Sequence, residues 1–381
     1  MSQKIDISII SSGASYADAR LHRLTRALLR AGLTVEIFAP GSRKDAPTNV
    51  QVDGTSDAPQ LILRTPLIGT AWKNTSLLAR YYRSRIFAIR SRGRVLYAIS
   101  PESVAPAYAL TRITRKKLAV DFFEDYLRLL KDRAWARKFF GIVGWIASSD
   151  TKSALWFSKR ADLTTVADVQ VPPFDARNRL VLRNLPDLSM LTKSGARGST
   201  PRAIYIGDLR KSRGLHTMLE AAAIANDWEF DFVGGVAAAD QEFVDQWFAK
   251  NPGSESRVRF HGKLAPSESW KFAAGAWVGL SLLESTPAFV EAVPSKLYEY
   301  MSVGLATIST PLPRCVDLIE KSKSGAIEST PEGVAARLAM WRNHPDELDS
   351  LRQQGAIWAE QNLDSEREYL NFSAEMVKLT R

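Results

Sequence analysis

The sequence predicts an α/β protein made of two doubly wound, Rossmann-like domains that face a central cleft. Three observations lead to this prediction. The chain has 381 residues, which is too long for one ordinary domain. Each half opens with the same order of strand, glycine-bearing loop, helix and strand. Further apolar strand-like segments alternate with helices, a pattern typical of parallel sheets covered on both faces.

The first half opens with "KIDISIISSGASYADARLHRLTRALLRAGLTVEIFAP". Its helix ends at Gly32 and carries four leucines on one face: Leu21, Leu24, Leu28 and Leu29. More strands are expected in "RVLYAIS", "KLAVDFF", "DLTTVA" and "RLVLRN". Residues 1–187 are therefore predicted to form the N-terminal domain.

The second half repeats this order in "RAIYIGDLRKSRGLHTMLEAAAIANDWEFDFVGG", with later strands in "RVRFHG", "WVGLSLL" and "LATIST". A polar stretch rich in Ser, Gly and basic residues precedes it and is typical of a linker. The predicted boundaries are 188–202 for the linker, 203–360 for the second domain and 361–381 for a C-terminal helix. Ligands of such sheets bind at the carboxyl ends of the strands, which we expect to line the cleft.

Three features of the sequence indicate the cellular compartment of the protein. The single cysteine, Cys315, excludes an internal disulfide, as suits a reducing compartment. The opening "MSQKIDISII" lacks the pattern of a signal peptide. The longest uncharged apolar runs are well short of the ~20 residues that span a bilayer. We expect a cytoplasmic protein.

The net charge of +10 is unevenly spread: residues 1–190 hold 30 Lys and Arg against 16 Asp and Glu, and the remainder holds 21 against 25. Either the first half meets an anionic surface, or it is a basic, soluble domain. A basic and aromatic stretch there suits the headgroups of an anionic membrane on its inner face: Trp135, Arg137, Lys138, Phe139 and Phe140. The alternative is a core-facing stripe with snorkelling cations. No nucleic-acid-binding module is recognised, so no nucleic-acid partner is expected.

Two segments of the second half suit a nucleoside diphosphate. In "YIGDLRKSRGLHTML", a glycine turn precedes a helix and carries cations, which suits a diphosphate; its residues are Gly207, Arg210, Lys211 and Arg213. The alternative is a solvated basic turn.

In "VEAVPSKLYEYMSVGLATIST", a helix begins at Ser295 and places Lys296 in its first turn. Glu299 offers two acceptor oxygens for vicinal ribose hydroxyls, and Glu291 offers a second carboxylate. The alternative is an exposed ion pair worth a few tenths of a kcal/mol.

Together, "GDLRKSRGL" and "EAVPSKLYEYMSVGLATIST" resemble the retaining glycosyltransferases of the GT-B fold, family 4 type (glycosyl transferases group 1). Their C-terminal domains carry a G-x-L-x-x-x-K-G loop and an E-x7-E element. The segments "DARLHRLTRALLRAGLTVEIF", "VDFFEDY" and "RNLPD" are similar to N-terminal motifs of the same family.

The resemblance implies transfer of a sugar from a UDP or GDP donor to a glycan or lipid-linked acceptor in cell-surface polysaccharide or glycolipid synthesis. It implies retained anomeric configuration, no metal and no other cofactor. Arg213 matches the diphosphate lysine, Glu299 the ribose carboxylate and Glu291 the acid near the donor sugar. The phosphate turn is matched by Ser295, Lys296 and Leu297, and the first loop, on the acceptor side, by Ser12 and Gly13.

Two positions depart from the family. Asp208 stands where many members have arginine, so Arg210 or Lys211 would supply that charge. Phe123 stands where the family has a histidine, whose role would pass to Glu124 or Asp125. The competing interpretations are a nucleotide-sugar epimerase of similar fold and a non-catalytic nucleotide-sugar-binding protein.

Overall fold

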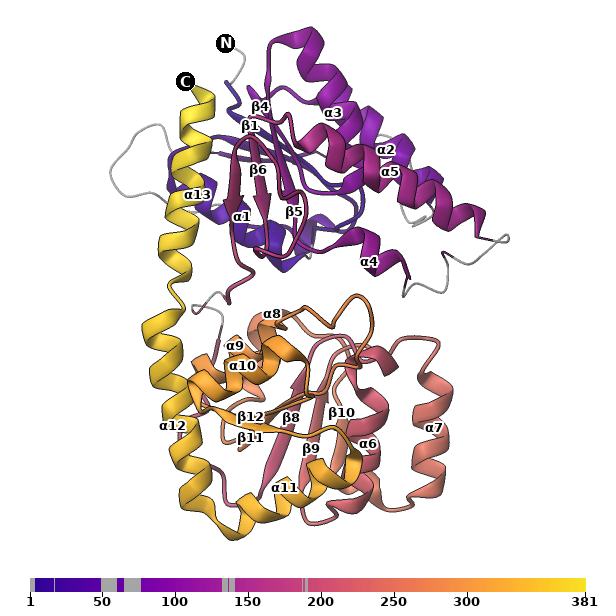
Figure 1. Cartoon of the computed structure of the whole chain (residues 1–381), viewed down its shortest axis with the longest axis vertical. Coiled ribbons are helices and arrows are strands. Elements are labelled where there is room, and N and C mark those ends of the chain that lie inside the picture. The colour runs from indigo at the N-terminus through magenta and orange to yellow at the C-terminus, as the bar shows by residue number, and fades with distance from the viewer. Residues whose placement is uncertain are drawn as a thin grey trace. The chain divides into compact units, whose positions relative to one another are not determined.

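The computed structural model describes residues 4–16, 18–48, 60–64, 77–131, 136, 141–186, 188 and 191–381. The chain divides into two compact units: unit 1 is Met1–Asn184 with Ser365–Arg381, and unit 2 is Leu185–Asp364. Each unit holds one parallel sheet with helices on its faces (Figure 1). The predicted α/β class with two Rossmann-like sheets is confirmed.

The sheet of unit 1 has seven strands in the order β3-β2-β1-β4-β5-β6-β7. β1 pairs in parallel with β2 and with β4. Its strands are β1 (Ile7–Ile10), β2 (Val35–Phe38), β3 (Leu61–Arg64), β4 (Val95–Ala98), β5 (Lys117–Phe122), β6 (Leu163–Val166) and β7 (Arg179–Val181). β1, β2, β4 and β6 are buried along their whole length, as expected for parallel strands covered on both faces.

The helices of unit 1 are α1 (Ala19–Arg30), α2 (Leu77–Arg90), α3 (Pro101–Thr114), α4 (Tyr126–Lys131), α5 (Ile142–Ser158) and α13 (Ser365–Thr380). α1 begins where the Asp18 carboxylate accepts from two backbone amides, those of Arg20 and Leu21, a typical N-cap. The four leucines predicted for its inner face are all buried. α13 returns to this unit and buries Phe372 and Met376 in the same core.

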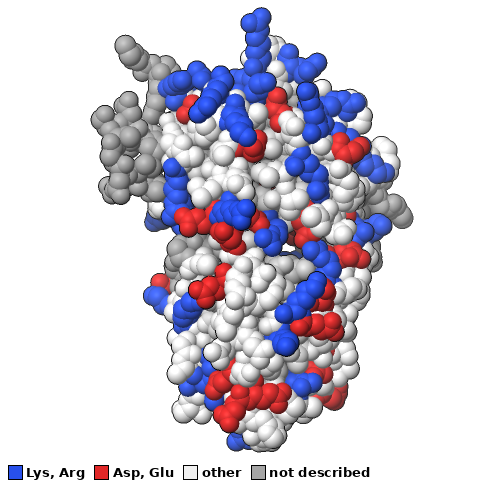
Figure 2. Space-filling view, turned by 60° about the vertical axis from the view of Figure 1, so that its left-hand side comes forward, with Lys and Arg blue, Asp and Glu red and all other residues white. Residues whose placement is uncertain are grey.

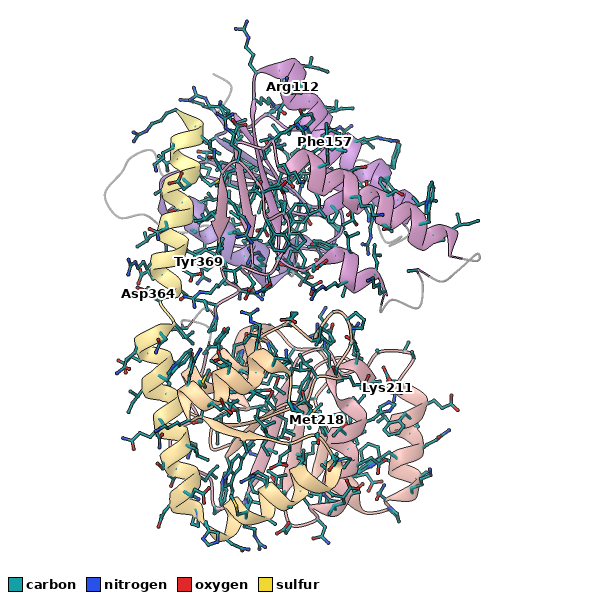
Figure 3. The ribbon with its side chains drawn as sticks, in the orientation of Figure 1. Arg112, Phe157, Lys211, Met218, Asp364 and Tyr369 are labelled. Carbon is teal, nitrogen blue, oxygen red and sulfur yellow. The ribbon has the colours of Figure 1, made fainter. Side chains whose placement is uncertain are left out.

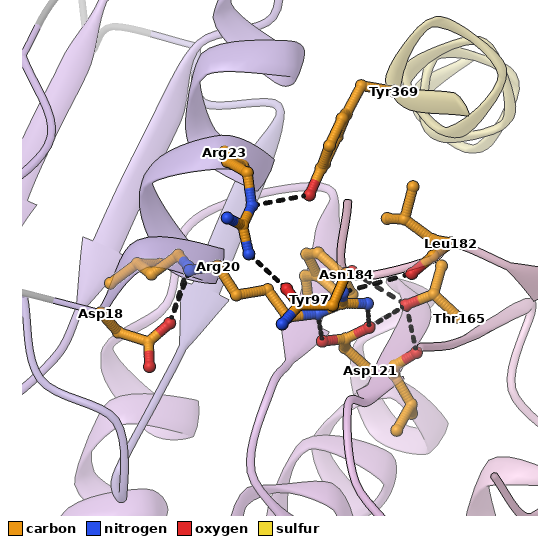
Figure 4. Close-up of polar contacts among 11 residues, drawn as sticks. Asp18, Arg20, Arg23, Tyr97, Asp121, Thr165, Leu182, Asn184 and Tyr369 are labelled. Carbon is orange, nitrogen blue, oxygen red and sulfur yellow. Dashed lines mark hydrogen bonds and ion pairs between the residues drawn. The ribbon is translucent and has the colours of Figure 1, made fainter. Parts of the chain in front are cut away.

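A buried ion pair joins α1 to β5 (Figure 4). Nε and one terminal nitrogen of Arg20 donate to the two carboxylate oxygens of Asp121, each at 2.7 Å. Thr165 donates to Asp121 at 2.5 Å, and Arg20 also reaches the Leu182 carbonyl at 3.2 Å. The Asp121 carboxylate raises the pKa of Arg20 against the opposing effect of burial. Both residues belong to motif-like segments, "DAR" and "VDFF", and their contact shows that these segments meet in the core of unit 1.

The sheet of unit 2 has six strands in the order β10-β9-β8-β11-β12-β13. They are β8 (Arg202–Ile206), β9 (Glu229–Val233), β10 (Val258–Phe260), β11 (Val278–Ser281), β12 (Ala306–Ser309) and β13 (Gly325–Ile327). The helices are α6 (Leu215–Ile224), α7 (Gln241–Lys250), α8 (Pro266–Lys271), α9 (Ser295–Val303), α10 (Pro313–Ser322), α11 (Pro331–Asn343) and α12 (Pro345–Asn362). Trp228 and Trp341 are buried in its core.

Each sheet reverses its strand order once. In unit 1 the reversal lies between β1 and β4, and in unit 2 between β8 and β11. At such a point the loops that follow the two strands diverge and leave a crevice beyond their carboxyl ends, where open α/β sheets bind ligands. The topology therefore predicts that ligands bind at the loops after Ile10, Ala98, Ile206 and Ser281.

Hydrogen bonds and an ion pair attach the described part of the expected linker, 188–202, to unit 2. The Ser194 amide donates to the Val303 carbonyl at 2.8 Å, and the Gly198 amide donates to the Gly275 carbonyl at 2.9 Å. Arg197 forms a bidentate ion pair with Asp349 at 2.7 and 2.8 Å. The chain thus passes from unit 1 to unit 2 at Asn184 and Leu185, and back at Asp364 and Ser365.

Candidate functional site

The predicted donor residues lie at the reversal point of unit 2, on the loops after β8 and β11 and in α9. The two loops touch directly, because the Glu284 amide donates to the Ser212 carbonyl at 3.1 Å. A short 3-10 turn, Lys211–Arg213, leads into α6 on one side, and α9 begins on the other.

Gly207 ends β8 with a φ of 143°, which favours glycine. A Cβ on Gly207 would lie 2.6 Å from both Cε and Nζ of Lys296. The side chain of Lys296 therefore crosses the bare backbone of Gly207 and brings the start of α9 to the end of β8.

Gly214 starts α6 with a φ of 86°. A Cβ there would lie 2.1 Å from the carbonyl oxygen of Leu282, a backbone atom that cannot move aside easily. Only glycine allows the basic turn to approach β11 this closely.

Two arginines of this turn carry unused donors. Nε of Arg210 and Nε of Arg213 are buried and have no hydrogen-bond partner among the described residues. A terminal nitrogen of Arg210 donates to Asp208 at 2.8 Å, and the guanidinium of Arg213 lies 5.8 Å from the ring centroid of Phe289. Because a buried donor without an acceptor is costly, these side chains are suited to an anion.

Lys296 adds a third cation in this region. Burial and the positive charge of Arg213 lower its pKa to about 8, while the carboxylates of Glu299 and Asp208 act in the opposite direction. Its Nζ lies 5.5 Å from the ring centroid of Tyr205. A lysine poised in this way gains its charge most readily when an anion binds beside it.

Both helices that begin here lack a side-chain cap. The N-cap residue is Gly214 in α6 and Pro294 in α9, and neither helix has a side-chain cap hydrogen bond. Uncapped N–H groups at a helix start attract negative charge. The site therefore combines backbone donors with three cationic side chains.

The other predicted residues of unit 2 are distributed around this centre. Ser295 is the first residue of α9, and Glu299, one turn further, interacts electrostatically with Lys296. Glu291 lies before α9, where Arg314 donates to its backbone carbonyl at 3.0 Å.

The Leu297 side chain is fully buried in the core, so only its backbone can face a ligand. Lys211 is exposed at the edge of the loop, whereas Met218 of α6 points into the core (Figure 3).

Sequence reasoning missed Tyr205. Its ring lies beneath Lys296, Arg213 hydrogen-bonds its hydroxyl, and burial raises its pKa to about 12. The hydroxyl also donates to the Asp208 carbonyl at 2.9 Å. The available signal was the hydroxyl of Tyr205 in the otherwise apolar run "AIYI".

In unit 1, the predicted loop residues Ser12 and Gly13 lie at the reversal point of that sheet. The Ser12 hydroxyl is 3.1 Å from Oγ of Ser100, and Arg83 donates to the Ser12 carbonyl at 3.1 Å. A Cβ on Gly13 would lie 3.1 Å from Oε1 of Glu102. The contacts of Arg83 and Glu102 with this loop were not predicted from the sequence.

Glu124 lies in the turn between β5 and α4. Its charge adds to burial in raising the pKa of Tyr126 well above its ordinary value. Phe123 packs edge-on against Tyr126 with ring centroids 5.5 Å apart. Phe123 thus has a packing contact at the position where the family carries a histidine.

The five residues predicted to contact a membrane, Trp135, Arg137, Lys138, Phe139 and Phe140, lie outside the described residues. Within the described part of the chain, no helix is both long and apolar enough to cross a bilayer. Nor do the described residues contain a group of three or more His, Cys, Asp or Glu side chains arranged to hold a metal ion.

Residues 190–358 match the family described as glycosyl transferases group 1. A search of curated proteins found no match.

Several solved structures share the fold. Sucrose-phosphate synthase from Thermosynechococcus elongatus has a TM-score of 0.69 and 15% identity, covering 99% of both chains. Anabaena Alr3699/HepE in complex with UDP and glucose has a TM-score of 0.68 and 15% identity, covering 98% of this chain and 99% of that chain. A glycosyltransferase from Rickettsia africae ESF-5 has a TM-score of 0.63 and 12% identity, with coverage of 98% and 99%. The chain therefore has a GT-B fold, and its residues 190–358 are similar to the glycosyl transferases group 1 family.

Proposed function

We propose that this protein is a retaining, metal-independent glycosyltransferase that uses a UDP- or GDP-linked sugar. The observation that carries the proposal is the group of Arg210, Arg213 and Lys296 around two uncapped helix starts. A diphosphate offers the charge and the several acceptor oxygens that such a group needs. The family match over residues 190–358 supports the same assignment.

The proposed chemistry breaks the bond between the anomeric carbon and the diphosphate oxygen and forms a bond to the acceptor oxygen. The leaving diphosphate gains negative charge, which Arg213 and Lys296 stabilise. The acceptor hydroxyl loses its proton, and Glu124 in unit 1 is a candidate to receive it. Glu299 holds the ribose hydroxyls, and Glu291 contacts the donor sugar.

For the donor, UDP has the more direct support, because HepE, which shares the fold, is described in complex with UDP and glucose. For the acceptor, we propose a glycan or a lipid-linked glycan of cell-surface polysaccharide or glycolipid synthesis. Ser12 and Gly13 are the residues of unit 1 that we expect nearest to it. This assignment implies a protein of the cytoplasm, associated peripherally with the inner face of the cell membrane.

Binding of the nucleotide is tested by thermal shift with UDP and GDP. Either nucleotide at a hundred times its Kd should stabilise the protein by about 2.7 kcal/mol. Glu299→Ala should lose most of this stabilisation because it removes the ribose acceptors. Glu320→Ala, which removes an exposed carboxylate on α10, is the matched control and should respond as the wild type does. If neither nucleotide stabilises the wild type, the proposed donor site is wrong.

Turnover separates the transferase from its two alternatives. An epimerase would convert the donor with no acceptor present, and a non-catalytic protein would bind the nucleotide without converting the donor. Donor consumption that depends on an added acceptor supports the transferase alone.

Nucleotide binding should also weaken as pH rises. Lys296 has a lowered pKa of about 8, so it is mostly charged at pH 7 and mostly neutral at pH 9. If the diphosphate binds the charged form, the Kd for UDP should rise about tenfold between these pH values. Lys296→Arg keeps its charge throughout and should give a nearly flat profile. Calorimetric titration across this range checks the expectation, and a flat wild-type profile would contradict it.

A further inference from the structure

Helix α5 of unit 1 has its small and large residues on unexpected sides. Four small residues occupy its buried face: Ala147, Thr151, Ala154 and Ser158. The opposite face holds four large apolar residues that remain exposed: Ile142 (56%), Trp145 (71%), Ile146 (41%) and Trp156 (49%). A surface helix of a globular domain normally buries its large apolar residues. In α5 several of them face outward instead.

The inner contacts of α5 are already satisfied. Phe157, near its C-terminal end, packs against Tyr108 of α3 with ring centroids 4.6 Å apart, and Arg112 lies over the same tyrosine (Figure 3). Thr151 donates to the Ala147 carbonyl within the helix. The small residues let α5 lie close to its neighbours. Poor packing of the inner face is therefore not the reason why the aromatic residues of α5 are exposed.

Cations, and no acids, accompany these apolar residues on the outward face. Lys152 is exposed between the two tryptophans, and the guanidinium of Arg160 lies 3.7 Å from the ring centroid of Trp156. The single acid of α5, Asp150, is hydrogen-bonded to Tyr81 of α2, and burial raises its pKa to about 6. The outward face of α5 therefore carries positive charge beside its apolar groups.

The charge of the whole unit has the same sign. Unit 1 contains 33 Lys and Arg against 18 Asp and Glu, a net charge of +15, while unit 2 contains 18 against 23, a net charge of −5. On the face shown in Figure 2, Lys and Arg gather over unit 1. Such a unit is attracted to an anionic surface over a distance of about one Debye length.

We propose that the outward face of α5 docks on an anionic lipid bilayer, with Trp145, Trp156, Ile142 and Ile146 entering the headgroup region. Tryptophan is favoured at this depth because its ring is apolar and its N–H remains hydrogen-bonded. Lys152 and Arg160 lie where they pair with lipid phosphates. A protein partner would also bury the aromatics, but the net charge of unit 1 favours a broad anionic surface. The inference stands apart from nucleotide binding, which occurs in unit 2.

The test is co-sedimentation of the full chain with phosphatidylcholine vesicles, with and without phosphatidylglycerol. The wild type should bind the anionic vesicles and bind them less at high salt. Trp145→Ser combined with Trp156→Ser should reduce the bound fraction about fivefold or more, because it removes both aromatic anchors. Leu370→Ser is the matched control, because Leu370 is 60% exposed on α13 of the same unit. This variant should bind the vesicles as the wild type does.

Three results would overturn the proposal. These are no binding of the wild type to anionic vesicles, equal binding to neutral ones, or equal binding of the double tryptophan variant. Light scattering on the same samples identifies the competing occupant: a wild-type dimer that the double variant dissociates, without vesicle binding, would make this face a contact between copies of the chain. Thermal shift with UDP on both variants shows separately whether the donor site is intact.

Discussion

Replacing Asp121 by alanine is expected to lower the free energy of unfolding by about 3–5 kcal/mol. Asp121 is the counter-charge of Arg20, and both side chains are almost fully buried. Without the carboxylate, the guanidinium would remain in the core with an uncompensated charge. Thr165 would also lose an acceptor at 2.5 Å. The large cost therefore comes from the stranded partner more than from the lost attraction.

Chemical denaturation measures this change, and hydrogen exchange of the β5 amides assigns it to unit 1. Asp175→Ala is the matched control, because Asp175 pairs with Lys159 at 2.8 Å on the surface of the same unit. Surface pairs are worth about 1 kcal/mol or less. Replacing both buried partners, as Arg20→Met with Asp121→Leu, should recover part of the loss. If Asp121→Ala costs no more than Asp175→Ala, the buried pair does not have the importance assigned to it.

Replacing Arg213 by alanine should weaken binding of UDP or GDP at least tenfold and reduce sugar transfer by a similar factor, a loss of about 1.4 kcal/mol or more. Arg213 brings a charge and a buried, unpaired Nε to the turn before α6. Its removal also takes away a charge that lowers the pKa of Lys296, so the remaining lysine would be more fully charged. The observed loss is therefore the net of two opposing effects.

Two further variants sharpen this test. Arg213→Lys should keep most of the affinity, because the family motif that this loop resembles carries lysine at the matching position. Arg342→Ala removes a half-exposed arginine of α11 that pairs with Asp227, and it should leave binding unchanged. Equal affinities for Arg213→Ala and Arg342→Ala would contradict the placement of the diphosphate beside Arg213.

Much of the proposed donor site in unit 2 follows from local patterns. Gly207, Arg210, Arg213, Lys296 and Glu299 occur in two short segments with glycine turns and helix starts that are visible in the sequence. No sequence pattern shows that the Lys296 side chain crosses Gly207. Nor does a pattern show that Tyr205 contacts both Lys296 and Arg213. The contacts of Lys296 join residues far apart in the chain, so they depend on how β8 and α9 come together.

Most strands of the fold could also be predicted from the sequence. The segments expected to form β4–β7 and β10–β12 all contain strands, since each is a short apolar run between turn signals. β3 and β13 were not foreseen. Both are edge strands of their sheets, and their residues are only partly buried. The C-terminal helix was expected, but its return to unit 1 was not.

By itself the sequence determined the α/β class, the repeated strand–loop–helix order and the cationic turns, because these follow from periodicity and residue chemistry along the chain. Only the tertiary structure decided which distant residues meet. It placed Asp121 against Arg20 in a buried pair, fastened the expected linker to unit 2, and turned the tryptophans of α5 outward. In each case the local sequence is compatible with several environments, and the packing of the whole unit selects among them. For Arg20 and Asp121 it selects the environment in which the two buried charges are paired.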